Sequence, residues 1–279
     1  MPHTALNRVI VRMLFDPIFV ETLYLDPYPT LSALKIPEDL ILELVKTDKR
    51  AWGVDTERRK RTLHALIGEF KCTTALALSE SQSIGLLDAF FSHPLFHDSI
   101  QNRGSLTEAF IEYLNHLYIN NDVTHPHFPD ILTLEATKAR NRRAHKNQPT
   151  SPASAVFYRC PGVSSKALNG NVIVALNKIE QYLYDLNLLP ILALCEDRPP
   201  FPTLPSVSEP THFLFRPRDE DIHLSPISIV IHDALRILKS PLTRDSFLKQ
   251  MKEKGLSTNQ GGNLLDALLG EGLLKSSHH

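Results

Sequence analysis

The segment 211-THFLFRPRDEDIHLSPISIVIHDALRIL-238 decides how the C-terminal half of this chain is expected to fold. Its first part alternates as a β-strand does, with Phe213 and Phe215 on the face expected to enter the core. The opposite face carries His212, Leu214 and Arg216. The surrounding sequence offers few other strands. We therefore expect the backbone from His212 to Arg216 to lie at a sheet edge that has no partner within the chain.

The flanking segments predict three strands followed by three helices. AVFYRC (155–160) and the apolar run PILALCE (190–196) predict the other two strands. Ser225-Pro226 predicts the start of the first helix, because proline is well tolerated in a first helical turn. Thr243 is expected to cap the second helix and Gly255 to end it. Ser257 or Thr258 is expected to cap the third, whose apolar face carries Leu264, Leu265, Leu268 and Leu269. This order outlines a winged helix-turn-helix.

The first half of the chain predicts helices. Apolar residues recur at helical spacing after Asp55 and again after Ser105, where Ser-Leu-Thr-Glu forms a capping-box sequence. Further helices are predicted near 37–47, 82–92, 129–146 and 171–186. The polar segment 146–154 has two prolines and is the expected linker. We therefore predict a mostly helical α+β protein, with a helical domain over 1–148 and a winged-helix-like domain over 149–275.

Composition narrows the functional classes. The 279 residues are 42% hydrophobic and 22% charged, with a formal net charge of −1, which gives no support to a nucleic-acid or membrane-surface protein. The cysteines Cys72, Cys160 and Cys195 are widely spaced and odd in number, which favours a reducing, cytoplasmic compartment. No apolar run approaches the roughly 20 residues of a membrane-spanning helix.

No motif in the sequence indicates autonomous catalysis. GxSxG, the Walker A loop, GxGxxG, CxxC and HExxH are all missing from the sequence. His93 and His97 lie four residues apart, and His125 and His127 lie two apart, but neither pair has further ligands at a known metal-site spacing. Exposed or helix-capping histidines are the favoured interpretation, and a stand-alone metalloenzyme stays a minor hypothesis.

Two functional readings apply to the predicted winged helix. In one hypothesis the domain binds DNA, and a third helix that reads DNA carries basic or amide side chains. The predicted third helix has no Lys or Arg, and it contains Asp266 and Glu271. Its side chains that could contact bases are Asn259, Gln260 and Asn263. The alternative is capture of an extended peptide by strand addition.

A basic run at the end of the 129–146 helix suits either the helix dipole or an acidic partner. Its members Arg140, Arg142 and Arg143 are candidates for a partner interface.

Three segments, 52–70, 126–143 and 155–163, followed by the predicted winged helix, resemble the MbnC family of methanobactin biosynthesis. The resemblance implies a non-catalytic subunit that pairs with an MbnB-type iron oxidase. Such an oxidase uses dioxygen to convert cysteines of a ribosomally made precursor peptide into oxazolone–thioamide groups. It also implies that an MbnA-type leader peptide pairs with the third strand and packs on the third helix.

Carried onto this sequence, the resemblance assigns the leader-binding site to eight residues. They are His212, Phe213, Leu214, Phe215, Arg216, Leu264, Leu265 and Leu268. No histidine matches an iron-ligand position, so iron is expected in the partner and no cofactor in this chain. The alternative function that remains open is a winged-helix DNA-binding regulator.

Overall fold

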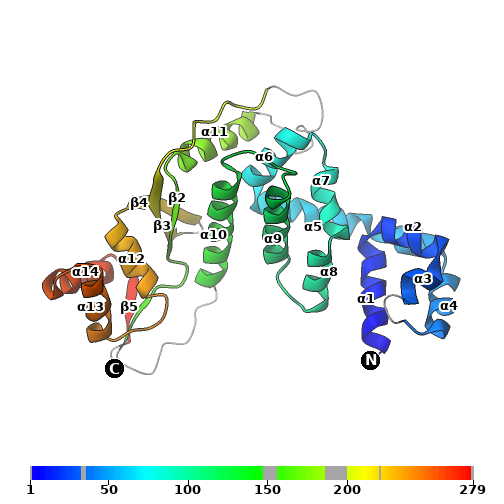
Figure 1. Ribbon diagram of the computed structural model, residues 1–279, viewed down its shortest axis with the longest axis horizontal. Coiled ribbons are helices and arrows are strands. Elements are labelled where there is room, and N and C mark those ends of the chain that lie inside the picture. Colours follow the sequence, from blue (N-terminus) through cyan, green and yellow to red (C-terminus); the bar gives the residue numbers. More distant parts are fainter. Residues whose placement is uncertain (1, 33–35, 147–155, 186–199, 220, 278–279) are drawn as a thin grey trace. The chain divides into compact units, whose positions relative to one another are not determined.

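The computed structural model of the chain describes residues 2–32, 36–146, 156–185, 200–219 and 221–277 (Figure 1). It is 65% helical with a small antiparallel sheet, which confirms the predicted mostly helical α+β class. The predicted strand at 190–196 and almost all of the predicted linker at 146–154 lie outside the described residues. Among the described helices, none is long and apolar enough to cross a membrane.

Residue contacts divide the chain into two compact units. The first contains 1–132 and 178–203, and the second contains 133–177 and 204–279. Helices α10 (Phe128–Lys146) and α11 (Val172–Asp185) each begin in one unit and end in the other. The predicted division into 1–148 and 149–275 is a single cut, whereas the compact units alternate along the chain.

The first unit is built from short helices. They are α1 (Pro2–Phe15), α2 (Pro17–Leu25), α3 (Pro27–Ser32), α4 (Glu38–Lys46), η1 (Lys49–Asp55), α5 (Thr56–Glu69), α6 (Lys71–Ser81), α7 (Gly85–Asp88), η2 (Ala89–Ser92), α8 (Pro94–Gln101) and α9 (Leu106–Ile119). The predicted apolar faces of α5 and α9 are buried, including Phe70 and Phe110, whose rings meet edge to face. Ser105 caps α9 by accepting a 3.3 Å hydrogen bond from the Glu108 N–H.

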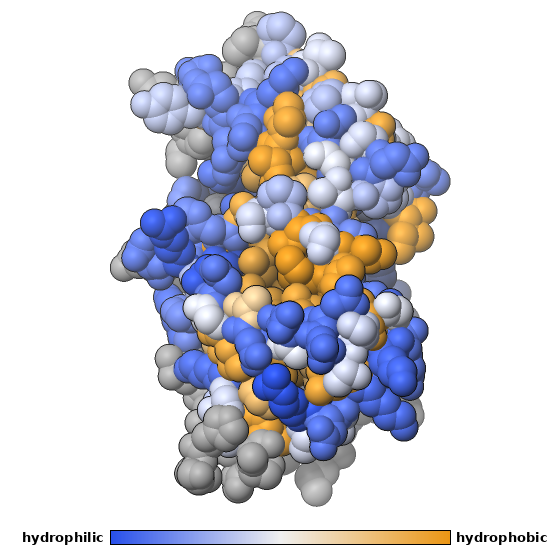
Figure 2. Space-filling view, turned by 90° about the vertical axis from the view of Figure 1, so that its left-hand side faces the viewer, coloured by the Kyte–Doolittle hydropathy of each residue, from blue (hydrophilic) through white to orange (hydrophobic). Residues whose placement is uncertain are grey.

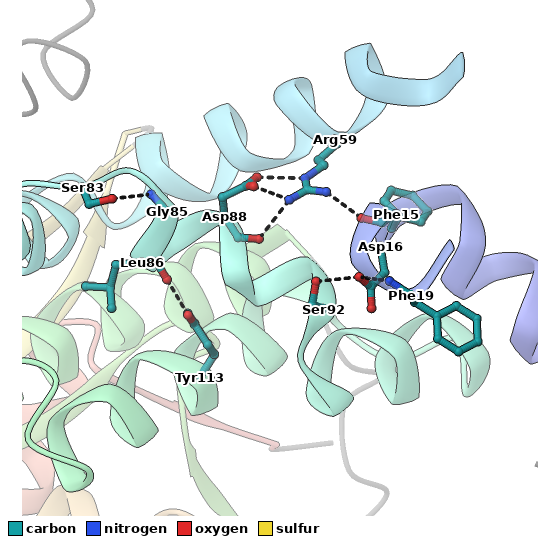
Figure 3. Close-up of polar contacts among 10 residues, drawn as sticks. All are labelled: Phe15, Asp16, Phe19, Arg59, Ser83, Gly85, Leu86, Asp88, Ser92 and Tyr113. Carbon is teal, nitrogen blue, oxygen red and sulfur yellow. Dashed lines mark hydrogen bonds and ion pairs between the residues drawn. The ribbon is translucent and has the colours of Figure 1, made fainter. Parts of the chain in front are cut away.

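A partly buried polar network joins helices of this unit (Figure 3). The guanidinium of Arg59 pairs with the carboxylate of Asp88 and donates a 2.8 Å hydrogen bond to the Phe15 carbonyl oxygen. Asp16 is 2% exposed and accepts from the Phe19 N–H and the Ser92 hydroxyl, each at 3.0 Å. These bonds satisfy groups that burial would otherwise leave without water.

The second unit contains two small antiparallel sheets. β2 (Ser164–Asn169), β3 (Pro210–Arg218) and β4 (Asp221–Ile227) form one, in the order β2-β3-β4. β1 (Phe157–Arg159) and β5 (Leu274–Ser276) form the other. β1 falls within the predicted strand 155–160, but the prediction that it shares a sheet with HFLFR was wrong.

HFLFR lies in the central strand, so its predicted edge position was also wrong. In the observed register Leu214 lies opposite Ser165 of β2 on one side and Ser225 of β4 on the other. β2 was missed because SSKALN is largely polar, and β4 was missed because Ser225-Pro226 also predicts a helix start. Ser225-Pro226, predicted to begin a helix, belongs to β4 instead.

Three helices follow the sheet: α12 (Ile229–Ile237), α13 (Arg244–Glu253) and α14 (Thr258–Gly270). Ser228 caps α12, three residues later than predicted. The predicted Thr243 cap of α13 is confirmed, and of the two predicted caps of α14 Ser257 is the one observed. The core of these helices also includes Leu214 from β3.

Candidate functional site

A groove of about 630 Å³ opens in the second unit between the β3–β4 hairpin and α14. Its apolar lining comes from both strands, from α12, from α14 and from Leu273, which follows α14. These residues are Leu214, Leu224, Ile227, Ile231, Leu264, Ala267, Leu268 and Leu273. On the face drawn in Figure 2, hydrophobic side chains gather in a hollow near mid-height between more hydrophilic surfaces.

One face of α14 forms the helical wall of the groove. Four residues of this face line the groove, at the i, i+3, i+4 and i+7 spacing that places residues on one side of a helix. They are Leu264, Ala267, Leu268 and Glu271. Leu268 is buried, whereas Ala267 is exposed. The wall therefore combines a packed base with a rim that a ligand can reach.

Four of the eight predicted peptide-binding residues line this groove. They are Leu214, Arg216, Leu264 and Leu268. Phe213 and Phe215 point to the other face of the sheet, at 5% and 0% exposure, as strand alternation requires. Leu265 is fully buried in the core of the three helices. His212 packs against the ring of His232, with 4.5 Å between ring centroids.

The prediction missed the contribution of β4. His223, Leu224, Ser225 and Ile227 all line the groove. The signal in the sequence was the alternation of Ile222 and Leu224 with His223 and Ser225, which is typical of a half-buried strand. Ser225-Pro226 hid that signal because the same dipeptide also predicts a helix start.

β4 forms one edge of the sheet among the described strands. In its register with β3, Pro226 lies opposite Phe213, and Ile222 lies opposite Pro217. A hydrogen-bonded antiparallel pair exchanges two N–H···O bonds, and proline has no N–H. Both pairs are therefore non-hydrogen-bonded. By alternation the backbone groups of Ile222, Leu224 and Pro226 point away from β3.

This outward edge has limited hydrogen-bonding capacity. Pro226 has no N–H, and the Ile222 N–H donates a 2.8 Å hydrogen bond to the carboxylate of Asp221. Of these three residues, Leu224 is the one whose outward N–H is neither missing, as in Pro226, nor engaged by Asp221, as in Ile222. An added strand would therefore centre its backbone bonding on Leu224, and side chains in the groove would have to supply the remaining affinity.

Charged residues lie at the hairpin end of the groove. Arg216, Arg218 and His223 come from the strands and Glu271 from the C-cap of α14. The Nη1 atom of Arg216 lies 3.4 Å from the Glu271 carboxylate, and both side chains are largely exposed. Exposed pairs of this kind contribute only about 0 to 1 kcal/mol, so this contact can exchange.

The three basic interface candidates lie near the end of α10. Arg142 donates a 2.7 Å hydrogen bond to Asp221, and this bond holds the pKa of Asp221 below its ordinary value. Arg140 and Arg143 are exposed, and each also has interactions within the chain. Arg142 thus has a structural role in positioning β4.

The histidine pairs have local structural roles. His93 caps α8 by accepting a 3.3 Å hydrogen bond from the Leu95 N–H, and His125 accepts one of 3.2 Å from the His127 N–H. His97 is 6% exposed, and burial lowers its pKa to about 4. Within the described ranges, no three His, Cys, Asp or Glu residues are grouped so that they could hold a metal ion.

The side chains proposed to read DNA are partly engaged. The Gln260 side chain completes the capping box by accepting a 2.9 Å hydrogen bond from the Ser257 N–H. Asp266 pairs with Arg244 of α13 at 3.1 Å, and α14 itself contains no basic residue. Asn259 and Asn263 are exposed. This surface would bring acidic groups close to a phosphate backbone.

Comparison with protein-family models, with curated proteins and with solved structures found no match to the chain.

Proposed function

We propose that this chain is the substrate-recognition subunit of a heterodimeric, iron- and dioxygen-dependent oxidase that modifies cysteines of a ribosomally made peptide, as in methanobactin biosynthesis. The observation that carries the proposal is the groove between β4 and α14. The sheet β2-β3-β4 followed by α12, α13 and α14 supports a winged helix-turn-helix, in which β4 is the third strand and α14 the third helix. The groove thus lies where the resemblance to the MbnC family implies that a leader peptide binds.

The proposed binding mode differs from the one expected from sequence. β3 is paired on both sides, so its backbone is not available to a peptide. The leader would instead lie along β4, with its backbone bonded at Leu224 and alternate side chains entering the groove. Leu214, Arg216, Leu264 and Leu268 then act through their side chains.

Iron would belong to the partner subunit. Within the described residues, no three His, Cys, Asp or Glu side chains are grouped so that they could hold a metal ion. The contribution of this chain is to tether the substrate. A leader held here raises the effective concentration of the attached cysteines near the partner's active site, to the millimolar range for short flexible linkers.

The first test concerns the genes beside the one that encodes this chain. We expect an iron-oxidase barrel gene and a short cysteine-containing reading frame. The leader segment of that reading frame, labelled with a fluorophore, is the probe for titration with the purified chain. If neither gene is present, the proposal is wrong.

The second test blocks the groove. Ala267→Trp places a large side chain in the groove without removing a buried group, and we expect at least a tenfold loss of leader affinity. Asn263→Trp is the matched control, because Asn263 is exposed on the same helix but does not line the groove. Equal affinity for both variants would contradict the proposed site. Salt-sensitive binding to the upstream promoter in place of peptide binding would support the DNA-binding alternative.

A further inference from the structure

The groove is polarised along its length. Arg216, Arg218 and His223 lie toward the β3–β4 turn, whereas Ile227 and Ile231 lie toward the start of α12. The Arg216–Glu271 contact places the C-terminal end of α14 at the charged end. Leu264, two helical turns before Glu271, lies about 10 Å from that end.

The charged end favours an anionic group. Its lining contains two arginines against one glutamate. Arg216 shares its charge with Glu271 in an exposed pair, and Arg218 has no ion pair within the described part of the chain. Asp219 and Asp221 of the turn do not line the groove, and Asp221 is paired with Arg142. Arginine binds carboxylates well because its planar donors match their geometry.

We propose that the groove selects extended peptides carrying an acidic and an apolar residue two or four positions apart. This inference rests on the proposed function and specifies its substrate. The apolar side chain enters beside Ile227, Ile231 and Leu264, and the acidic side chain binds Arg216 and Arg218 in place of Glu271. Glu271 occupies the carboxylate position when no peptide is bound.

The spacing follows from helix and strand geometry. The roughly 10 Å between the two ends corresponds to about three residues at 3.3 Å per residue of strand. Side chains of a strand that face the same way are separated by even numbers of residues. Separations of two or four positions are therefore the ones that place both side chains in the groove.

Synthetic peptides test this selectivity by fluorescence anisotropy with the full chain. The reference is a nine-residue serine–threonine peptide with leucine at its third position and glutamate at its seventh. One comparison peptide moves the glutamate to the sixth position, and another replaces it with glutamine. We expect both to bind about three- to tenfold more weakly than the reference, because each loses the arginine–carboxylate contact.

Variants of the charged end provide the second readout. Arg218→Gln should weaken the reference peptide about threefold or more and leave the glutamine peptide unchanged. Glu271→Gln should strengthen binding of the reference peptide, because it frees Arg216. Arg244→Gln is the charge-matched control, since Arg244 pairs with Asp266 and does not line the groove.

The outcomes separate the two proposals. If all three peptides bind equally and Ala267→Trp abolishes their binding, the groove binds peptides and the acidic selectivity is wrong. If neither these peptides nor the leader from the neighbouring reading frame binds, the proposed function is wrong and the selectivity with it. Retention of glutamate preference in Arg218→Gln and in Arg216→Gln would overturn the assigned carboxylate site.

Discussion

The guanidinium of Arg142 and the backbone N–H of Ile222 both donate to the same carboxylate oxygen of Asp221, at 2.7 and 2.8 Å. This relationship joins the end of α10 to the first residue of β4, one of the strands that line the groove. The sequence had suggested Arg142 as part of a partner interface. In the structure its hydrogen bond to Asp221 instead helps to position β4 within the same unit.

Arg142→Gln is expected to lower the free energy of unfolding by about 0.5 kcal/mol, because both partners of the ion pair are largely exposed. Arg142 lowers the pKa of Asp221. The contribution of this ion pair to the free energy of unfolding is therefore present above pH 3.8, the ordinary pKa of the carboxyl group, and is lost as the pH falls through the lowered pKa. Urea unfolding at several pH values measures it. The difference between wild type and variant should be smaller under strongly acidic conditions than at neutral pH, and a constant difference would contradict this account.

Proline substitutions test the assigned edge of β4. Leu224→Pro should lower stability by no more than about 1 kcal/mol, because the N–H of Leu224 points away from β3. Ser225→Pro should lower it by about 3 kcal/mol, because Ser225 pairs with Leu214 and would lose a ladder bond. The two positions are adjacent, so each controls for the other in a thermal-unfolding comparison. If Leu224→Pro were the less stable variant, the backbone N–H of Leu224, and not that of Ser225, would be the one that points toward β3.

Gly162 lies in the turn between β1 and β2 with φ of +81°, a left-handed conformation that favours glycine. A Cβ atom there would lie 2.7 Å from the Pro217 side chain and 2.8 Å from the Asn141 carbonyl oxygen. We expect Gly162→Ala to lower the free energy of unfolding by roughly 3 kcal/mol. Gly255→Ala has a similar φ but an open environment, so it should lower it by about 1 kcal/mol. Equal losses would mean that the close approach at Gly162 contributes nothing.

His97 predicts sensitivity to acid. Burial, followed by the nearby charge of Arg12, lowers its pKa from 6.5 to about 4, while Asp16, the Phe91 backbone and Asp98 act in the opposite direction. The unfolded state therefore binds the proton more readily, and stability falls as the pH drops through 6.5 toward 4. The loss should be on the order of 2 kcal/mol.

His97→Leu should remove this part of the pH dependence. Both ring nitrogens are buried, and among the described residues neither has a hydrogen bond of good geometry, so the variant should be at least as stable as the wild type at neutral pH. His64→Gln, at an exposed histidine, is the control and should retain the wild-type pH profile. If His97→Leu also retained it, the acid sensitivity would have to arise from other groups.

Local signals in the sequence predicted several helix ends, whereas helices α1, α2, α3, α6 and α8 were not predicted. Thr243 and Gly255 bound α13, and Ser257 with Gln260 forms the capping box of α14, because these effects depend on residues within a few positions of each other. The burial of Phe213 and Phe215 followed from strand alternation in the same way. The Ser228 cap was missed because Ser225-Pro226 offered a competing helix start three residues earlier.

The sheet could not be predicted to the same degree. Strand pairing joins residues that are far apart in sequence, as with Ser165 and Leu214, and nothing local to either specifies the partner. β2 is largely polar because its backbone pairing with β3 does not require an apolar side chain at each position. The position of HFLFR at the centre of the sheet therefore had no signature within HFLFR itself.

Taken alone, the sequence determined the mostly helical class, several helix ends and the burial of Phe213 and Phe215, since periodicity and capping act over a few residues. The tertiary structure decided which strand lies at the edge, which leucines of α14 reach the groove, and that Arg216 meets Glu271 across 55 positions of sequence. These features depend on the register and packing of distant segments. For that reason the candidate site is formed by both strands of the β3–β4 hairpin and by α14, whereas the sequence had indicated β3 and α14 alone.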